Sequence, residues 1–350
     1  MDRARTPDDL LSGPRGRRLC LAVAELLGPG VRAALPVFAA APLADEVREA
    51  LAALLGEIDP TTISALEERG DNGLWGALGE TTEVARYWQE PDENHAILAQ
   101  PTILAALRPV AEAICADPRT AWWASPMDTR RQRHVRWLDD SPSVPLATAG
   151  AAGRLASWRA ATLTDERESA TRPSDPTAMV SGQWWSIPAL VGLPSTTSSR
   201  PGLAAIGLAL VEDGLGWQEA LVTPVAVRPG IRVYEITGAA AWSTLATRYP
   251  LDLSLSRRHD WWRTTGEATR WVIPDWEAVS HDFDAVHLTV WGYLCAAGRA
   301  IVAGEAKTVL AGWDPDRTYW LTDVLAGELP ATEWHRTVGQ ALSWSPAGTE

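Results

Sequence analysis

Several kinds of residue that would mark a protein class are scarce in this 350-residue sequence. The three cysteines, Cys20, Cys115 and Cys295, lie far apart, which argues against a disulfide framework or a cysteine zinc site and predicts buried thiols. No apolar run approaches the roughly 20 residues of a membrane helix, and residues 1–9 lack the apolar stretch of a signal peptide. We therefore expect a soluble, cytoplasmic protein without a membrane partner.

Positive charge is also limited. Lysine occurs once, at Lys307, and 31 basic residues face 44 acidic ones, which gives a net charge of −13. A chain this negative repels phosphate backbones at long range, so nucleic acid is disfavoured as a partner. The exception is the basic run 130–136 between Trp123 and Trp137. It is either a phosphate-binding surface or, because Asp128 and Asp139 adjoin it, a solvated face with internal ion pairs.

The motifs of the large enzyme classes are missing as well. The sequence contains no phosphate loop of the GxxxxGK type, no GxGxxG after a predicted strand, no GxSxG turn, no HExxH and no kinase signature. No activity can therefore be assigned from a motif, and candidate sites have to be found from side-chain chemistry.

Tryptophan is the abundant aromatic residue. There are 19 tryptophans but only two phenylalanines and five tyrosines. Most indoles are therefore expected to pack in the core, in the place that phenylalanine and tyrosine take in other proteins. Three adjacent pairs stand out, namely Trp122-Trp123, Trp184-Trp185 and Trp261-Trp262. If such a pair lies in a strand, its rings point to opposite faces, and one ring of each pair is then free to line a pocket or a protein interface.

Hydrophobic periodicity predicts helices in the first third of the chain, over 17–26, 43–56, 81–89 and from Pro101 onward, with Pro109 expected to kink or split the last one. One more helix is expected over 147–161. The turn-rich segment from Ala170 to Thr177 then marks a boundary between a mainly helical unit, 1–170, and a strand-rich unit, 182–350.

The second unit reads mainly as strands. Apolar runs at 203–212 and 218–227, joined by a turn at Asp213-Gly214, predict a hairpin, and further strands are expected at 230–236, 285–294 and 307–311, with a helix over 238–249. The predicted fold class is α+β, a helical N-terminal unit followed by a mixed, mainly antiparallel sheet with flanking helices.

The run 285–294 is the clearest of these strands. Alternation places Val286, Leu288 and Val290 on a core face, and His287, Thr289, Trp291 and Tyr293 on the other face, where they are expected to form a pocket wall or a polar interface. The nearby set His281, Asp282, Asp284 and His287 contains metal-ligand chemistry, but Asp284 and His287 would face opposite sides of a strand. This favours a turn over a metal centre, and no metal site is predicted.

A second constellation combines an indole with hydroxyl groups and a carboxylate. Trp185 and Ser186 lead into the run Ser195 to Ser199, and Glu212 and Arg232 follow near strand ends. Over about residues 130–300 this arrangement resembles the mono-ADP-ribosyltransferases, with Arg133 or Arg136 as the leading arginine. The resemblance implies NAD as a substrate, held by Thr196 and Thr197, with Glu212 as a catalytic carboxylate. Read without the resemblance, Ser195 to Ser199 form a solvated loop.

A third constellation, Arg257 to Arg263, surrounds a tryptophan pair with ionisable groups, and its arginines can either clamp an anion or cover a core edge with their stems. The candidate site therefore comprises Glu212 and His287 as catalytic residues, and Ser186, Thr196, Thr197, Arg258, Trp185 and Tyr293 as substrate-binding residues.

Three functional hypotheses follow from these residues. The first is a group-transfer enzyme that acts on a nucleotide or sugar-like substrate, with NAD-dependent ADP-ribosyl transfer as its most specific form. The second is a non-catalytic adaptor that binds a protein partner through a tryptophan-rich interface, and the third is a pocket protein for a small molecule. Convergence of Glu212, His287 and Arg258 on one cleft would favour the first or third hypothesis, whereas a flat exposed tryptophan patch would favour the second.

Overall fold

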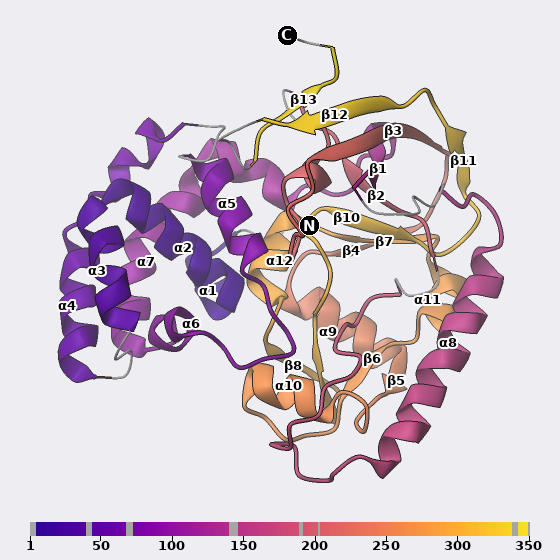
Figure 1. Ribbon diagram of the computed structural model, residues 1–350, viewed down its shortest axis with the longest axis horizontal. Coiled ribbons are helices and arrows are strands. Elements are labelled where there is room, and N and C mark those ends of the chain that lie inside the picture. Colours follow the sequence, from indigo (N-terminus) through magenta and orange to yellow (C-terminus); the bar gives the residue numbers. More distant parts are fainter. Residues whose placement is uncertain are drawn as a thin grey trace.

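A bundle of helices stands beside a twisted sheet, and a smaller group of helices and short strands lies below that sheet (Figure 1). The structure is a computed structural model that describes residues 5–39, 44–67, 73–139, 146–188, 192–201, 204–337 and 342–348, without the side chains of 36–39. The arrangement is the predicted α+β class.

The helical bundle contains the N-terminal third of the chain. Its helices are α1 (Pro7–Ser12), α2 (Pro14–Leu27), α3 (Pro29–Ala39), α4 (Asp45–Gly56), α5 (Leu74–Glu83), α6 (Glu93–Leu98) and α7 (Pro101–Ala116). Four of them begin at a proline, whose fixed φ suits a first turn that needs no amide donor. Thr6 and Asp92 cap α1 and α6 by accepting main-chain amides.

One expectation for this bundle was wrong. Residues 81–89 are not one helix, because α5 begins earlier, at Leu74, and ends at Glu83. Of the two outcomes expected at Pro109, a kink or a split, the split does not occur, since α7 continues to Ala116 with its apolar side buried against α2 and α4. Packing on a long amphipathic face therefore compensates for the hydrogen bond that proline cannot make.

A nine-stranded sheet forms the second part, in the order β13-β12-β3-β1-β2-β10-β7-β4, with β11 also paired to β3. Its strands are β1 (Gln132–Trp137), β2 (Ser195–Ser198), β3 (Glu219–Val227), β4 (Val233–Ile236), β7 (Ala285–Leu288), β10 (Arg317–Trp320), β11 (Leu325–Glu328), β12 (Thr332–Arg336) and β13 (Trp344–Pro346). The β4–β7 pair is parallel and the other pairs are antiparallel, which confirms the mixed, mainly antiparallel sheet.

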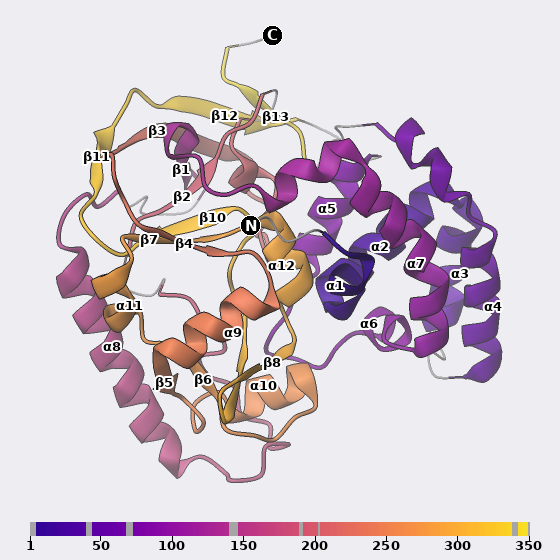
Figure 2. The same cartoon turned by 180° about the vertical axis from the view of Figure 1, so that it is seen from behind.

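The remaining elements flank the sheet. Two short ribbons pair β5 with β6 and β8 with β9, and α8 runs along the outer side of the molecule, where it contacts α11 (Figure 2). Their bounds are α8 (Ala151–Glu168), α9 (Ala239–Arg248), β5 (Pro250–Asp252), α10 (Arg258–Thr265), β6 (Val272–Pro274), α11 (Trp276–Asp282), α12 (Val290–Ala296), β8 (Ala300–Ala303) and β9 (Ala306–Val309).

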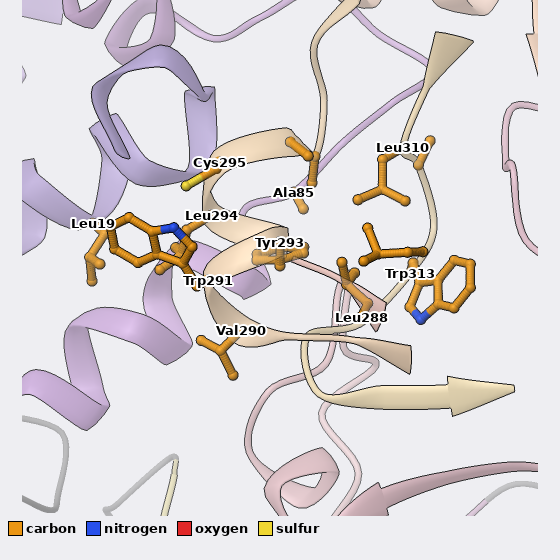
Figure 3. Close-up of a cluster of buried hydrophobic side chains, with 14 of the residues drawn as sticks. Leu19, Ala85, Leu288, Val290, Trp291, Tyr293, Leu294, Cys295, Leu310 and Trp313 are labelled. Atoms are coloured by element: carbon orange, nitrogen blue, oxygen red, sulfur yellow. The ribbon is translucent and has the colours of Figure 1, made fainter. Parts of the chain in front are cut away.

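The expected strand 285–294 is half strand and half helix, which corrects its predicted faces. The strand β7 ends at Leu288, and Thr289 caps α12 by accepting the amide of Gly292. His287, Trp291 and Tyr293 therefore do not share a strand face. All seven residues of α12 are buried, and Trp291 and Tyr293 lie among core side chains from the helical bundle and the sheet (Figure 3).

The expected strand 203–212 is also absent from the described residues, and residues 202–203 lie outside them. Ile206–Leu208 form a 3₁₀ turn that packs on the sheet, and β3 pairs with β1, β11 and β12 instead of forming a hairpin. The run is apolar because it is buried on the sheet rather than within it: Ile206 and Leu210 are completely buried. Apolar composition alone does not separate these two cases.

The sheet takes strands from both sides of the boundary expected at 170–182. Strand β1 precedes that boundary, yet it pairs with β2 and β3, which follow it. The helical bundle ends with α7, so the connection between α7 and β1 is where helical and strand structure meet. The boundary at 170–182 stays a prediction. No described helix is long and apolar enough to span a membrane.

Leu288 provides a test of the core. Its side chain is fully buried at the end of β7, where Ile236 of β4 is its parallel neighbour. Leu288→Ala should lower the free energy of unfolding by about 2–5 kcal/mol, because it leaves a cavity. The exposed Leu329 is a matched control, and Leu329→Ala should change stability by less than about 0.5 kcal/mol in the same urea titration. Equal stability of the two variants would contradict the packing described above.

Candidate functional site

A cavity of about 880 Å³ lies between the helical bundle and the lower part of the second unit. One wall comes from the α1–α2 junction and from residues 84–99, and the other from the C-terminal end of α10 and from residues 298–300, after α12. Figure 2 shows why these segments face each other: α12 stands between the sheet and the bundle, beside α1, and β8 continues from it toward α10. The volume is within the range of small-molecule sites, which is roughly 300–1,000 Å³.

Five arginines line this cavity, although the net charge of the chain is −13. Two of them are used by the fold. Arg263 donates to the carbonyl oxygens of Trp88 and Val180, both at 2.8 Å, and it also pairs with Asp260. Arg86 forms an ion pair with Asp213 at 3.2 Å. The other three are Arg15, Arg17 and Arg299.

Arg17 contacts main-chain carbonyl groups. Its guanidinium donates to the carbonyl oxygens of Leu11 and Ser12 at 3.3 and 3.4 Å, and its buried Nε has no hydrogen-bond partner among the described residues. Burial, and then the like charges of Arg299 and Arg15, lower the pKa of Arg17 to about 10. Burial also lowers the pKa of Arg299. The fold therefore holds cations together that repel each other.

Arg15 is oriented by a chain of polar contacts. The Nη2 group of this buried arginine lies 2.9 Å from Nε2 of His95, and Nδ1 of His95 lies 2.9 Å from Oδ1 of Asp92. An arginine can only donate, so we assign the proton of His95 to Nδ1 and its lone pair to Nε2. Burial lowers the pKa of His95, which keeps the ring neutral and able to accept from Arg15.

The pair Trp261-Trp262 divides its two rings between core and cavity, although it lies on α10 rather than on a strand. Trp261 is fully buried and its indole NH donates to the carbonyl oxygen of Trp184 at 2.7 Å, whereas the partly exposed Trp262 lines the cavity. The cavity thus offers an aromatic face as well as cationic groups. No tryptophan among the described residues is exposed, so no flat tryptophan patch is found there.

Glu212 does not lie at the rim of a cleft, contrary to expectation. Its carboxylate faces inward and accepts from the hydroxyl of Tyr87, and the buried hydroxyl of Tyr293 lies close enough for Glu212 to raise the pKa of Tyr293. Burial, and then the charge of Asp314, raise the pKa of Glu212 to about 8. Tyr87 packs directly behind Gly298, which lines the cavity. Glu212 is therefore behind the cavity wall and largely protonated at neutral pH.

His287 lies in a different buried cluster. Its Nδ1 is 2.6 Å from Oε2 of Glu235 and its Nε2 is 3.5 Å from Oδ1 of Asp316. Burial alone would lower the pKa of His287, but the hydrogen bonds and charges of Asp316 and Glu235 outweigh it and raise this pKa to about 9. The protonated ring joins β7 to β4 and to the turn before β10. It is a structural cation of the sheet.

The hydroxyl residues of the predicted site are also buried in the sheet. The Thr197 hydroxyl donates to Asp316 at 2.9 Å, and Thr196 accepts the indole NH of Trp320 at 2.8 Å. Ser186 exchanges hydrogen bonds with the main chain of Ala311, which fixes the segment that carries Trp185. Trp185 itself packs against Gly312 and Trp184.

Arg258 lies apart from the other candidates. It begins α10 and donates to the carbonyl oxygen of Pro173 at 3.0 Å. Within the described residues, no hydrogen bond or ion pair links it to Glu212 or His287. These three side chains therefore do not converge.

The cavity residues were not among the site residues predicted from the sequence. They include Arg15, Arg17, His95 and Arg299. A sequence clue exists in Gly13-Pro14-Arg15-Gly16-Arg17-Arg18, where basic residues follow a helix start.

Arg133 and Glu212 lie in different parts of the fold. Arg133 of β1 lies opposite Thr197 of β2 in the antiparallel register, so one candidate leading arginine does adjoin the hydroxyl-rich strand. Glu212 is not part of that strand pair. It follows the 3₁₀ turn and contacts Tyr87 of the helical unit.

The His287 cluster gives a prediction for stability against pH. Because the folded-state pKa, about 9, lies above the ordinary value of 6.5, the contribution of His287 is complete below pH 6.5 and is lost as the pH rises through 9. His287→Gln should therefore cost about 3–5 kcal/mol at pH 6, since the buried Asp316 and the partly buried Glu235 lose their cation, and clearly less at pH 10. Urea unfolding at both pH values measures this difference.

His134 is the control for this experiment. It pairs with a single carboxylate, Glu328, at 3.0 Å, and burial lowers its pKa. His134→Gln should not reproduce the loss between pH 6.5 and 10. A His287→Gln penalty that is equally large at pH 6 and pH 10 would show that the ring is not protonated in the folded protein.

Comparisons with known proteins add no relative to these observations. No protein-family model matches the chain, and no curated protein or solved structure matches it either. The resemblance to mono-ADP-ribosyltransferases therefore stays an expectation from the sequence, and functional inference rests on the cavity and on the clusters behind it.

Proposed function

We propose that the chain binds a small phosphate-bearing molecule, nucleotide-like or sugar-phosphate-like, in the cavity between the helical bundle and α10. The observation that carries this proposal is the grouping of Arg15, Arg17 and Arg299 on the cavity wall, where burial and then the like charges of Arg299 and Arg15 lower the pKa of Arg17. An anion placed between these groups removes their repulsion and provides acceptors for guanidinium donors.

The position of two of these arginines supports the proposal independently. Arg15 and Arg17 occupy the start of α2, where the helix dipole is positive, and no acidic residue occupies the first turn. Cations at this end of a helix destabilise it, whereas a bound anion is stabilised there by the dipole and by free amide groups. The start of α2 thus adds positive charge to a wall that also carries the carboxylates Glu90 and Asp92, of which Asp92 contacts His95.

The other features of the cavity suit the rest of such a ligand. Trp262 provides an aromatic face for a base or a sugar ring, and guanidinium groups near it provide further stacking and donor positions. Neutral His95 holds Arg15 in place without adding another positive charge. The structure thus supports a binding pocket with a cationic wall and an aromatic face.

Binding of phosphate, pyrophosphate, ADP and NAD to the full chain, measured by titration calorimetry, tests the proposal. Arg17→Ala and Arg299→Ala should each weaken binding of the preferred anion by roughly 10-fold to 150-fold, the equivalent of one charge-assisted hydrogen bond of about 1.5–3 kcal/mol. Arg17→Lys should have an intermediate effect, because it retains the charge but loses the planar fork.

The exposed Arg228, which does not line the cavity, is the matched control. Arg228→Ala removes the same net charge and should leave the dissociation constant within about twofold. Each variant must melt at the same temperature as the wild type, so that a loss of binding is not caused by a loss of folding. Absence of binding for all four ligands, or equal losses for Arg17→Ala and Arg228→Ala, would overturn the proposal.

Group transfer from NAD is the second candidate, and the Glu212 carboxyl favours it. A carboxyl group whose pKa is about 8, close behind the cavity wall, has the acidity of a general acid or base at physiological pH. If Glu212 acts as a base, nicotinamide release should rise with pH through about 8, and Glu212→Gln should abolish it while NAD binding persists. Chromatography of released nicotinamide measures this. No release by the wild-type chain would exclude the transferase hypothesis.

A further inference from the structure

Two glutamates and a histidine lie together on the sheet, far along the chain from the arginine-lined cavity. Glu219 begins β3, and the antiparallel register of β12 with β3 places His335 directly opposite it. Glu333 lies two residues before His335 on the same strand, so the three side chains project from one face.

The imidazole of His335 lies between the two carboxylates. Nδ1 of His335 is 3.7 Å from Oε1 of Glu219, and Nε2 is 3.4 Å from Oε1 of Glu333. Neither pair forms a direct hydrogen bond. One ligand atom from each of the three residues lies within 4.8 Å of the other two. Ligands about 2.0–2.1 Å from a tetrahedral metal ion are separated by roughly 3.3 Å, which is close to the 3.4 Å between Nε2 of His335 and Glu333. Glu219 faces the other ring nitrogen, so its side chain would have to turn toward the same ion.

The charge at this place also favours a cation. In the part of the chain that the structure describes, neither Glu219 nor Glu333 forms an ion pair with arginine or lysine, and they share the single imidazole of His335. A further carboxylate, Asp139, accepts the amide of Glu219 at 3.0 Å. The register places Arg136 on the same face as Glu333, but two strands away.

From this arrangement we propose that Glu219, Glu333 and His335 bind a divalent transition-metal ion of the Zn²⁺ class. Imidazole and carboxylate oxygen are ligands that such ions accept, and three protein ligands leave a position for water. The three side chains are 42–50% exposed, so the imidazole can rotate to present either nitrogen and the ion can enter from solvent. The ion would tie β12, and β13 beyond it, to β3.

Zinc titration of the full chain, purified without a histidine tag and freed of metal by a chelator, tests this proposal. The wild type should bind one Zn²⁺ per chain with a rise in melting temperature, and Co²⁺ should give a visible absorption band from the same site. His335→Ala and Glu219→Gln should each weaken Zn²⁺ binding at least tenfold and abolish the Co²⁺ band. Glu333→Gln keeps the shape of the side chain and should weaken binding comparably.

His134→Ala is the matched control, because His134 lies on the same sheet but pairs with only one carboxylate, Glu328. It should bind Zn²⁺ as tightly as the wild type. No Zn²⁺ binding by the wild type at millimolar concentration would overturn the proposal, as would an unchanged dissociation constant in His335→Ala, which would place the bound ion elsewhere. The proposed zinc site and the cavity share no residue. Zinc binding and anion binding can therefore succeed or fail independently.

Discussion

Helix α12 is buried along its whole length, and its neighbours approach it so closely that added atoms cannot be accommodated. A Cβ at Gly13, between α1 and α2, would lie well inside contact distance of the carbonyl oxygen of Leu294, and a Cβ at Gly292 would meet the carbonyl oxygen of Ile236. Glycine is therefore required on both sides of the helix, toward the bundle and toward the sheet. This packing fixes the bundle relative to the sheet (Figure 3).

The electrostatics of the cavity follow from that packing. Because α12 is held against α1 and α2, the residues after it, including Arg299, are brought to Arg15 and Arg17 at the start of α2. Desolvation of these cations is unfavourable, and the apolar area buried around α12 offsets it. The cost of holding them together is the main physical reason to regard this wall as a binding surface.

Much of the fold was predictable because it depends on local patterns. The α4 and α9 helices and the β3 and β4 strands follow from apolar periodicity and from the turns that flank them. The stretch 285–294 was misassigned because alternation is equally compatible with a short buried strand followed by a buried helix. Only the cap at Thr289 separates the two, and a threonine is also a common strand residue.

The candidate site was less predictable, since it is formed by residues about 280 positions apart, Arg17 and Arg299. Their proximity depends on how α12 docks, which no local pattern encodes. His287 was predicted from its place in an alternating strand, and Thr196 and Thr197 from their run of hydroxyl residues. The structure explains this differently: their partners, such as Asp316, are also buried, and the polar groups satisfy each other within the sheet.

The central claim is that an anion binds between Arg17 and Arg299. A crystal of the full chain soaked in tungstate, a phosphate mimic with strong anomalous scattering, tests this claim directly. We expect an anomalous peak in the cavity within hydrogen-bond distance of both guanidinium groups, roughly 2.7–3.2 Å. A cavity without a peak, in a crystal where tungstate occupies other positions, would contradict the account.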